Sequence, residues 1–431
     1  MEEKHGLILD VNEKPQPLQW AVLSVQHVFA MFGATILVPI ITGLPVSVAL
    51  FGSGVGTLIY ILCTRAKVPV YLGSSFAYIS AVSAAIGAMK GDVSAAQTGL
   101  MLVGLVYVIV AFVVKAIGKD WIDKLLPPIV IGPMIAVIGL GLAPTAISQA
   151  GFSADGDIRN MIVAIFTFTV TAFVSTKAKG FFKIIPFLCG IISGYVFAAI
   201  LGIVDFTPVM QVIESGKFIG LPDFYLPFST GGLFNEYHIY FGPETWALVP
   251  VALVTISEHI GDHTVLGKVC GRNFLKDPGL DRTLMGDGIA TAVSGFFGGP
   301  ANTTYGENTG VVGMTKIASV WVIGGAACIA ICLSCLPIVQ AVIQTIPQPV
   351  LGGMSLMLYG VIASNGLSVL VENQVDFGVQ RNLIIAAVML VIGIGGAVLP
   401  IGNFVTLSAT AFSAVVGIIL NLVLPSEKKS N

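Results

Sequence analysis

Long apolar stretches, separated by short groups of charged or turn-forming residues, follow one another along almost all of the 431 residues. About 20 apolar residues are enough for a helix to cross the hydrocarbon core of a membrane. Counting the stretches between charges, glycines and prolines therefore predicts fourteen transmembrane segments in an all-α polytopic membrane protein. The expected spans are 19–40, 46–64, 74–89, 97–116, 127–147, 160–176, 184–203, 245–266, 283–298, 306–315, 317–337, 340–363, 380–398 and 403–424.

The third and tenth spans are too short for ordinary transmembrane helices. Each follows a stretch of extended character, KVPVYLGSS before the third and GGPANTTYG before the tenth. We expect half-length helices that begin near Phe76 and Gly306. The first turn of a helix has backbone N–H groups without partners and carries partial positive charge. Two such helix starts could direct free donors toward one central point.

The composition agrees with a membrane protein. Hydrophobic residues make up 55% of the chain and charged residues 10%, against about 25% charged residues in a soluble domain. The polar residues are too few to cover a soluble globule. A net charge of −2 gives no indication of a nucleic-acid partner. The six cysteines are interpreted as small packing residues, and no metal site is expected.

The basic residues indicate how the chain crosses the membrane. If the N-terminus lies inside, 18 of the 21 Lys and Arg residues fall on the inner side, and the other three are Lys90, Arg159 and Lys217. This bias predicts a multi-pass protein of the cell inner (plasma) membrane with both termini cytoplasmic. The polar insert 204–243 falls outside and separates seven spans from seven. With an odd number of spans in each half, any repeat between the halves must be inverted.

Two short similarities favour such a repeat. Gln26–His27 in the first span corresponds to Glu258–His259 in the eighth, and SSFA at 74–77 resembles TTYG at 303–306. The offsets, 232 and 229, are nearly equal. Transporters built from inverted repeats place the substrate near the membrane midplane, between broken helices.

The stretch TISEHIGDHTV puts Glu258, His259, Asp262 and His263 inside the expected span 245–266. An acid at the centre of a membrane helix costs about 2.5–3.5 kcal/mol, so such residues usually have a function. Glu258 and Asp262 share one helix face and could bind substrate or protons, or the four residues could pair for packing. Zinc binding by the two histidines is disfavoured, because their order differs from HExxH and no third ligand is evident.

A second polar cluster lies at the start of the tenth span. Glu307 could be stabilised simply by the helix N-terminus, while Thr304 and Asn308 add hydrogen-bonding groups and Gly306 allows close approach of a ligand. Phe76, Tyr305 and Tyr359 could offer stacking faces. Carboxylate acceptors together with backbone donors suit the edge of a pyrimidine or a purine, although they do not single it out.

Three motifs carry a resemblance to a known family. ENTGVVGMTK (307–316), SEHIGDH and YLGSSFAYIS resemble motifs of the nucleobase–ascorbate transporters, the xanthine/uracil permeases, and PANTTYGENTGV is most similar to the bacterial uracil permeases. The resemblance implies two inverted repeats of seven spans. It implies a core domain of residues 19–116 and 245–337 that moves against a gate domain of residues 127–203 and 340–424. It also implies uracil–proton symport by a homodimer within the lipid membrane, with no cofactor.

The same resemblance assigns roles to individual residues. Glu258 and Glu307 would hold the uracil edge, the backbones of Phe76 and Gly306 would contact the base, Tyr305 would line the pocket, and Tyr359 would belong to its gate side. His27, His259, Thr304 and Asn308 are expected to support the site.

Position 262 departs from the resemblance, because many uracil permeases have histidine where this chain has Asp262. Like charges disfavour ionisation of both members of a pair, so Glu258 and Asp262 could share one proton. We expect Glu258 to carry the coupled proton and Asp262 to tune it. A purine or xanthine permease, or an anion transporter of the same fold, remains an alternative, whereas no motif indicates an enzyme.

Overall fold

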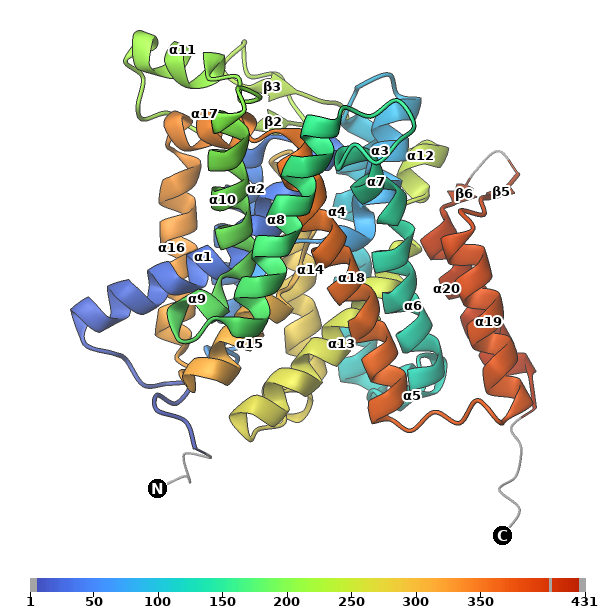
Figure 1. The fold of residues 1–431 in the computed structure, drawn as a ribbon. Helices are drawn as coiled ribbons and strands as arrows, with labels where there is room; N and C mark the ends of the chain where they lie inside the picture. The colour runs from blue at the N-terminus through green and yellow to red at the C-terminus, as the bar shows by residue number, and fades with distance from the viewer. Residues whose placement is uncertain (1–5, 403–404, 426–431) are drawn as a thin grey trace.

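The computed structural model describes residues 6–402 and 405–425, and these residues are mostly helical (Figure 1). Six helical stretches in this part of the chain are long and apolar enough to cross a membrane. They are α1 (Pro17–Thr42), α2 (Val46–Cys63), α4 (Ser94–Ile117), α6 (Pro128–Gly141) with α7 (Ala143–Gln149), α8 (Ile158–Lys177) and α18 (Gln348–Glu372). The expectation of a mostly helical, multi-pass membrane protein is confirmed.

Further helices and short strands complete the molecule. The remaining helices are η1 (Phe76–Tyr78), α3 (Ile79–Ala88), α5 (Asp120–Leu125), α9 (Phe181–Ile184), α10 (Pro186–Ile200), α11 (Thr207–Ser215), α12 (Pro243–Trp246), α13 (Val251–Cys270), η2 (Leu275–Gly279), α14 (Leu280–Phe296), α15 (Gly306–Thr315), α16 (Val320–Ser334), α17 (Pro337–Gln344), α19 (Gln380–Ile394) and α20 (Ala409–Val423). The strands are β1 (Leu72–Ser74), β2 (Tyr225–Leu226), β3 (Asn235–Glu236), β4 (Asn302–Thr304), β5 (Leu399–Ile401) and β6 (Val405–Leu407).

The long helices pack in two groups. In one group, α14 packs against α2 and α4, and α16 packs against α1 and α2. In the other, α18 packs against α6, α7 and α8, while α19 and α20 pack against each other and against α6. Helix α13 contacts both groups, through α4 and α15 on one side and α6 and α20 on the other. It therefore lies between them.

Small residues allow close helix contacts within both groups. A Cβ atom added at Gly104 of α4 would lie 2.4 Å from the carbonyl oxygen of Gly288 on α14. A Cβ added at Gly139 of α6 would lie 2.4 Å from the carbonyl oxygen of Tyr359 on α18. Membrane helices associate largely through packing of this kind, because lipid provides no hydrophobic force to bring them together.

Two short strands cross the interior of the first group. Strands β1 and β4 pair antiparallel, with Leu72 opposite Thr304 and Ser74 opposite Asn302. Helices η1 and α3 follow β1, and α15 follows β4; α3 and α15 each have ten residues. The structure thus confirms extended backbone before two half-length helices, which begin at Phe76 and Gly306. Pairing of the two strands gives hydrogen-bond partners to their backbone N–H and C=O groups, which cannot be left unpaired inside a membrane protein.

Several expected boundaries were wrong. The span expected at 245–266 is broken into α12 and α13. The spans expected at 317–337 and 340–363 are α16, α17 and α18, and the axes of α16 and α17 differ by 81°. Prolines at these breaks start new helices, whereas hydropathy continues across them. The insert 204–243 contains the unexpected helix α11. The span expected at 403–424 is α20, and residues 403–404 lie outside the described residues.

Candidate functional site

The four ionisable residues of α13 divide into a buried pair and an accessible pair. His259 and His263 are fully buried, and their rings stack with centroids 4.0 Å apart. Glu258 and Asp262 are each one position earlier on the helix and are only partly buried. The i,i+4 spacing places each pair on its own helix face. One helix therefore presents a histidine face and a carboxylate face.

The histidine face forms a buried hydrogen-bond network. The Nδ1 atom of His263 donates to the carbonyl oxygen of His259 at 2.7 Å, so its Nε2 atom can accept from the hydroxyl of Tyr60. The Nδ1 atom of His259 donates to Asp287 Oδ2 on α14 at 2.8 Å. Asp287 is fully buried. These contacts fix the buried face of α13 to α2 and α14.

Sequence reasoning missed Asp287. The signal was present, because Asp287 is the single acid in the expected span 283–298 and glycines flank it in the stretch MGDGI. A lone carboxylate inside a membrane span calls for a partner. That partner is His259. His259, which was predicted to support the site, therefore contacts Asp287 and not the accessible carboxylates Glu258 and Asp262.

The carboxylate face of α13 turns toward β4 and α15. The hydroxyl of Thr304 on β4 donates a short hydrogen bond to Asp262. Glu258 is close enough to Asp262, Asp287 and Glu307 for their charges to repel one another. Within the described chain, none of Glu258, Asp262 and Glu307 forms an ion pair with a basic residue. The structure therefore brings three predicted site acids together without neutralising them.

The start of α15 opens toward accessible space. Gly306 is exposed, and a Cβ atom added there would have no neighbour within 4 Å. Glu307 is half-buried, and its carboxylate lies near its own backbone N–H. Among the described residues, no side chain caps this helix start. Backbone donors and a carboxylate thus lie side by side at the first turn.

Aromatic residues surround the two helix starts. Phe76 and Tyr359 pack edge to face, with ring centroids 6.1 Å apart and planes at 73°. This contact joins η1 to α18, which belong to the two different helix groups. The hydroxyl of Tyr305 instead donates to the carbonyl oxygen of Ser74 at 3.1 Å, and its ring fills the space beside Gly73. Tyr305 holds the two strands together, and its side chain is buried.

The remaining predicted supporting residues form a separate contact. Asn308 Nδ2 on α15 lies 3.0 Å from His27 Nδ1 and 3.1 Å from the His27 carbonyl oxygen on α1. The side-chain amide nitrogen of Asn308 can only donate, so it donates in both cases and His27 Nδ1 accepts. His27 and Asn308 therefore fix α15 to α1 next to Glu307.

The described residues contain no group of three His, Cys, Asp or Glu side chains that could hold a metal ion. Cys332 and Cys335 form a CxxC pair at the end of α16, and both are free thiols. The accessible cluster consists instead of carboxylates, backbone N–H groups and aromatic edges. Such a cluster can hydrogen-bond a small planar molecule that carries both donors and acceptors.

The family of the chain follows from its sequence. The family model of the xanthine/uracil permeases, described as a permease family, matches residues 18–402. The chain belongs to the xanthine/uracil permease family. It is therefore a membrane transporter and not an enzyme, as the motifs predicted.

Similar proteins support this family and its fold. This permease is 48% identical to the uracil permease of Bacillus caldolyticus, over 98% of this chain and 96% of that protein. It is 45% identical to the uracil permease of Bacillus subtilis strain 168, over 99% and 97%. It is 42% identical to that of Escherichia coli strain K12, over 96% and 93%.

Two solved structures share the fold of this permease at low sequence identity. One is the transmembrane domain of the cyanobacterial bicarbonate transporter BicA, with a TM-score of 0.65 and 14% identity over 96% of this chain and 100% of that one. The other is the murine Solute Carrier 26 family member A9 anion transporter in the inward-facing state, with a TM-score of 0.70 and 11% identity over 96% and 69%.

Proposed function

We propose that this permease is a proton-coupled symporter that imports uracil across the cytoplasmic membrane by alternating access. The curated relatives at 42–48% identity are uracil permeases. The observation that carries the proposal is the accessible pair of acids, Glu258 and Glu307, beside the uncapped start of α15. Uracil has two ring N–H donors for the carboxylates and two carbonyls for backbone N–H groups.

Individual residues take the following proposed roles. Glu258 and Glu307 hold the donor edge of the base, and the backbones at Phe76 and Gly306 meet its carbonyls. Tyr359 closes the site from α18, against Phe76. Tyr305 contributes through its backbone next to Gly306, because its hydroxyl is held by Ser74. His27 with Asn308, Thr304 with Asp262, and His259 with Asp287 hold the surrounding elements.

Proton coupling is assigned to Glu258 and Asp262. Uracil is neutral, so the membrane potential alone does not concentrate it, whereas a co-transported proton does. Two nearby carboxylates without a basic partner favour uptake of one proton. The protonated acid can donate to a uracil carbonyl, and loss of the proton to the inside leaves a charge that favours release. The proton thereby biases the equilibrium between outward-open and inward-open states.

The proposed architecture is fourteen spans in two inverted repeats of seven. The core domain comprises α1–α4 and α12–α16, and the gate domain comprises α6–α10 and α17–α20. The two helix groups, and the paired strands before two half-length helices, support this division. The two ends of the chain lie at one end of the molecule and α11 at the other (Figure 1), which supports two termini on the same side of the membrane. A homodimer is proposed from the family alone.

An anion transporter is the second candidate, because the two similar solved structures are a bicarbonate transporter and an anion transporter. An anion site favours neutral or basic groups, whereas this cluster has three acids without basic partners. Uptake of radiolabelled uracil into cells that lack their own permease tests the proposal. Excess uracil should compete strongly, and xanthine, adenine or bicarbonate should compete weakly. Uptake of xanthine in preference to uracil would instead identify a purine permease, and a failure to take up uracil would refute the proposal.

A further inference from the structure

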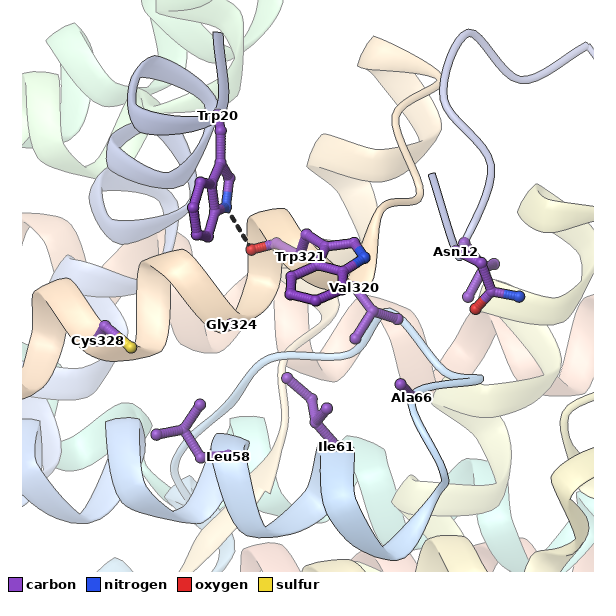
Figure 2. A pocket seen from close by; sticks show the side chains of 10 residues that line it. Asn12, Trp20, Leu58, Ile61, Ala66, Val320, Trp321, Gly324 and Cys328 are labelled. Carbon is purple, nitrogen blue, oxygen red and sulfur yellow. Dashed lines mark hydrogen bonds between the residues drawn. The ribbon is translucent and has the colours of Figure 1, made fainter. Parts of the chain in front are cut away.

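A cavity that none of the predicted site acids lines lies between α1, α2 and α16 (Figure 2). Its volume is about 480 Å³, within the usual range of roughly 300–1,000 Å³ for small-molecule sites. Its walls include Leu58 and Ile61 of α2 and Gly324 and Cys328 of α16. Val320 and Cys328 are eight residues apart on α16, so the cavity extends about 12 Å along that helix. It shares no lining residue with the predicted site.

Two tryptophans line this cavity, with Trp321 near its Val320 end and Trp20 close to Gly324 (Figure 2). Trp20 Nε1 of α1 donates to the carbonyl oxygen of Trp321 on α16 at 2.6 Å, and the rings are 6.5 Å apart edge to face (Figure 2). Lys14 Nζ lies 5.0 Å from the centroid of each ring. Lys14 is itself exposed. Tryptophan and lysine at the start of a span are typical of the boundary between headgroups and hydrocarbon.

The N-terminal segment around Val11 and Asn12 forms a fixed wall at the Val320 end of the cavity. The backbone of Ala318 donates to the carbonyl oxygen of Leu9, and that of Val320 donates to the carbonyl oxygen of Val11, both at 2.9 Å. Asp10 forms an ion pair with Arg272 at 2.7 Å, which ties the segment to the end of α13. Val11 and Asn12 line the cavity directly. The wall is thus built by contacts that tie it to the membrane helices.

The surroundings indicate what fills the cavity. Leu18 of α1 and Leu62 of α2 are 80% and 77% exposed, which in a membrane protein means contact with lipid. The cavity walls are mostly apolar, and the Lys14 ammonium lies beside the two tryptophan rings. A substrate as polar as a nucleobase would leave its hydrogen-bonding groups unpaired there. An anionic lipid would match both features, because its acyl chain fits the apolar walls and its headgroup can pair with the Lys14 ammonium.

We propose that this cavity is a binding site for an anionic phospholipid, with an acyl chain between α1, α2 and α16 and the headgroup phosphate at Lys14. Each buried methylene contributes to binding, and a basic residue near the membrane surface adds about a five-fold preference for an anionic lipid. The inner leaflet, where both termini are proposed to lie, is the leaflet richer in anionic lipid. The lipid would connect the N-terminal segment to the helices it packs against.

Native mass spectrometry of the delipidated protein tests this site. The probes are phosphatidylglycerol and phosphatidylcholine with identical acyl chains, and glycerol phosphate as the headgroup alone. We expect one phosphatidylglycerol to bind about five-fold more tightly than phosphatidylcholine, and glycerol phosphate not to displace it. Lys14→Ala should remove the preference for phosphatidylglycerol, whereas Lys177→Ala, which removes an exposed charge from α8, should retain it.

Gly324→Phe tests the acyl chain. A Cβ atom at Gly324 has Ile61 Cδ1 at 3.7 Å, an ordinary contact, so the new ring can enter the cavity. Displacement of a few methylenes should weaken binding of both lipids at least about ten-fold. Leu62→Phe, which enlarges an exposed α2 residue outside the cavity, is the matched control. Unchanged lipid binding by Gly324→Phe, or equal affinity of the wild-type protein for the two lipids, would overturn the proposal.

Alkylation of the unmodified chain tests the same site if Gly324→Phe does not fold. Cys328 lines the cavity, and Cys332 lies one turn further along α16 outside the lining; both are exposed. Bound phosphatidylglycerol should slow alkylation of Cys328 by N-ethylmaleimide at least about five-fold, relative to Cys332 in the same peptide digest. Equal slowing of both thiols, or no slowing of either, would contradict the site.

Discussion

The two faces of α13 place ionisable groups in opposite situations. On one face, His259 and His263 are fully buried and bonded to Asp287 and Tyr60. On the other, Glu258 and Asp262 are accessible and have no basic partner in the described structure. A buried, paired group fixes neighbouring elements in place. An accessible, unneutralised acid inside a membrane protein keeps its capacity to bind a ligand or a proton.

Changes on the accessible face should have the largest effect on transport. Glu258→Gln removes the group that exchanges the coupled proton, and Glu307→Ala leaves a ring N–H of the base unpaired. Each change should reduce uracil uptake at least about 100-fold. Membrane insertion should be unchanged, since neither carboxylate contacts a structural partner. Uptake of radiolabelled uracil, normalised to protein in the membrane, measures the effect. Wild-type uptake by both variants would remove these acids from the site.

Asp287→Ala should instead reduce stability. The change leaves the buried N–H of His259 without its acceptor, which typically costs about 1–3 kcal/mol. We expect the apparent melting temperature in detergent to fall by about 1–3 °C. Asp287→Asn is the matched control, because its amide oxygen can still accept from His259, and its melting temperature should fall less. A lost uptake with an unchanged melting temperature would assign Asp287 to transport rather than to packing.

Asp262 lies between the two situations, because it is accessible and also accepts from Thr304. Asp262→Asn retains an oxygen for this hydrogen bond and removes the charge beside Glu258. We expect the pH profile of uracil uptake to change, while affinity for uracil at one pH stays within about three-fold. Uptake measured from acidic to alkaline pH provides the comparison. An unchanged profile would exclude Asp262 from the proton path, and Thr304→Val separates the hydrogen bond from the charge.

The sequence could predict the local features of the site but not the contacts between its elements. The half-length helices at Phe76 and Gly306 were predictable, because length and preceding extended residues are local properties. The acids at 258, 262 and 307 could be singled out from the sequence, because charge is rare in apolar spans. Their role in transport stays a prediction. The pairing of His259 with Asp287 was missed, since it joins residues from two different helices. Tyr305 was expected in the pocket, but its hydroxyl bonds Ser74, a contact that depends on the register of β1 and β4.

The aromatic contact across the two helix groups should have a smaller effect. Phe76→Leu retains an apolar side chain but loses the edge-to-face contact with Tyr359, worth about 0.5–1.5 kcal/mol. Affinity for uracil should therefore fall by about two- to ten-fold. Binding measured by calorimetry on the purified protein separates this loss from expression. Tyr359→Phe keeps the ring and should bind more tightly than Phe76→Leu, whereas the reverse order would assign the effect to the Tyr359 hydroxyl.

The exposed ion pair at the end of α13 should contribute less to stability than the buried contacts of this helix. Lys268 Nζ and Glu372 Oε2 are 3.4 Å apart and join α13 to α18, with side chains 68% and 60% exposed. Water already solvates both groups, so the pair is worth less than about 1 kcal/mol. Lys268→Ala should shift the melting temperature by no more than about 1 °C and should lose its effect in high salt. A shift as large as that of Asp287→Ala would mean that burial does not decide the strength of pairing along this helix.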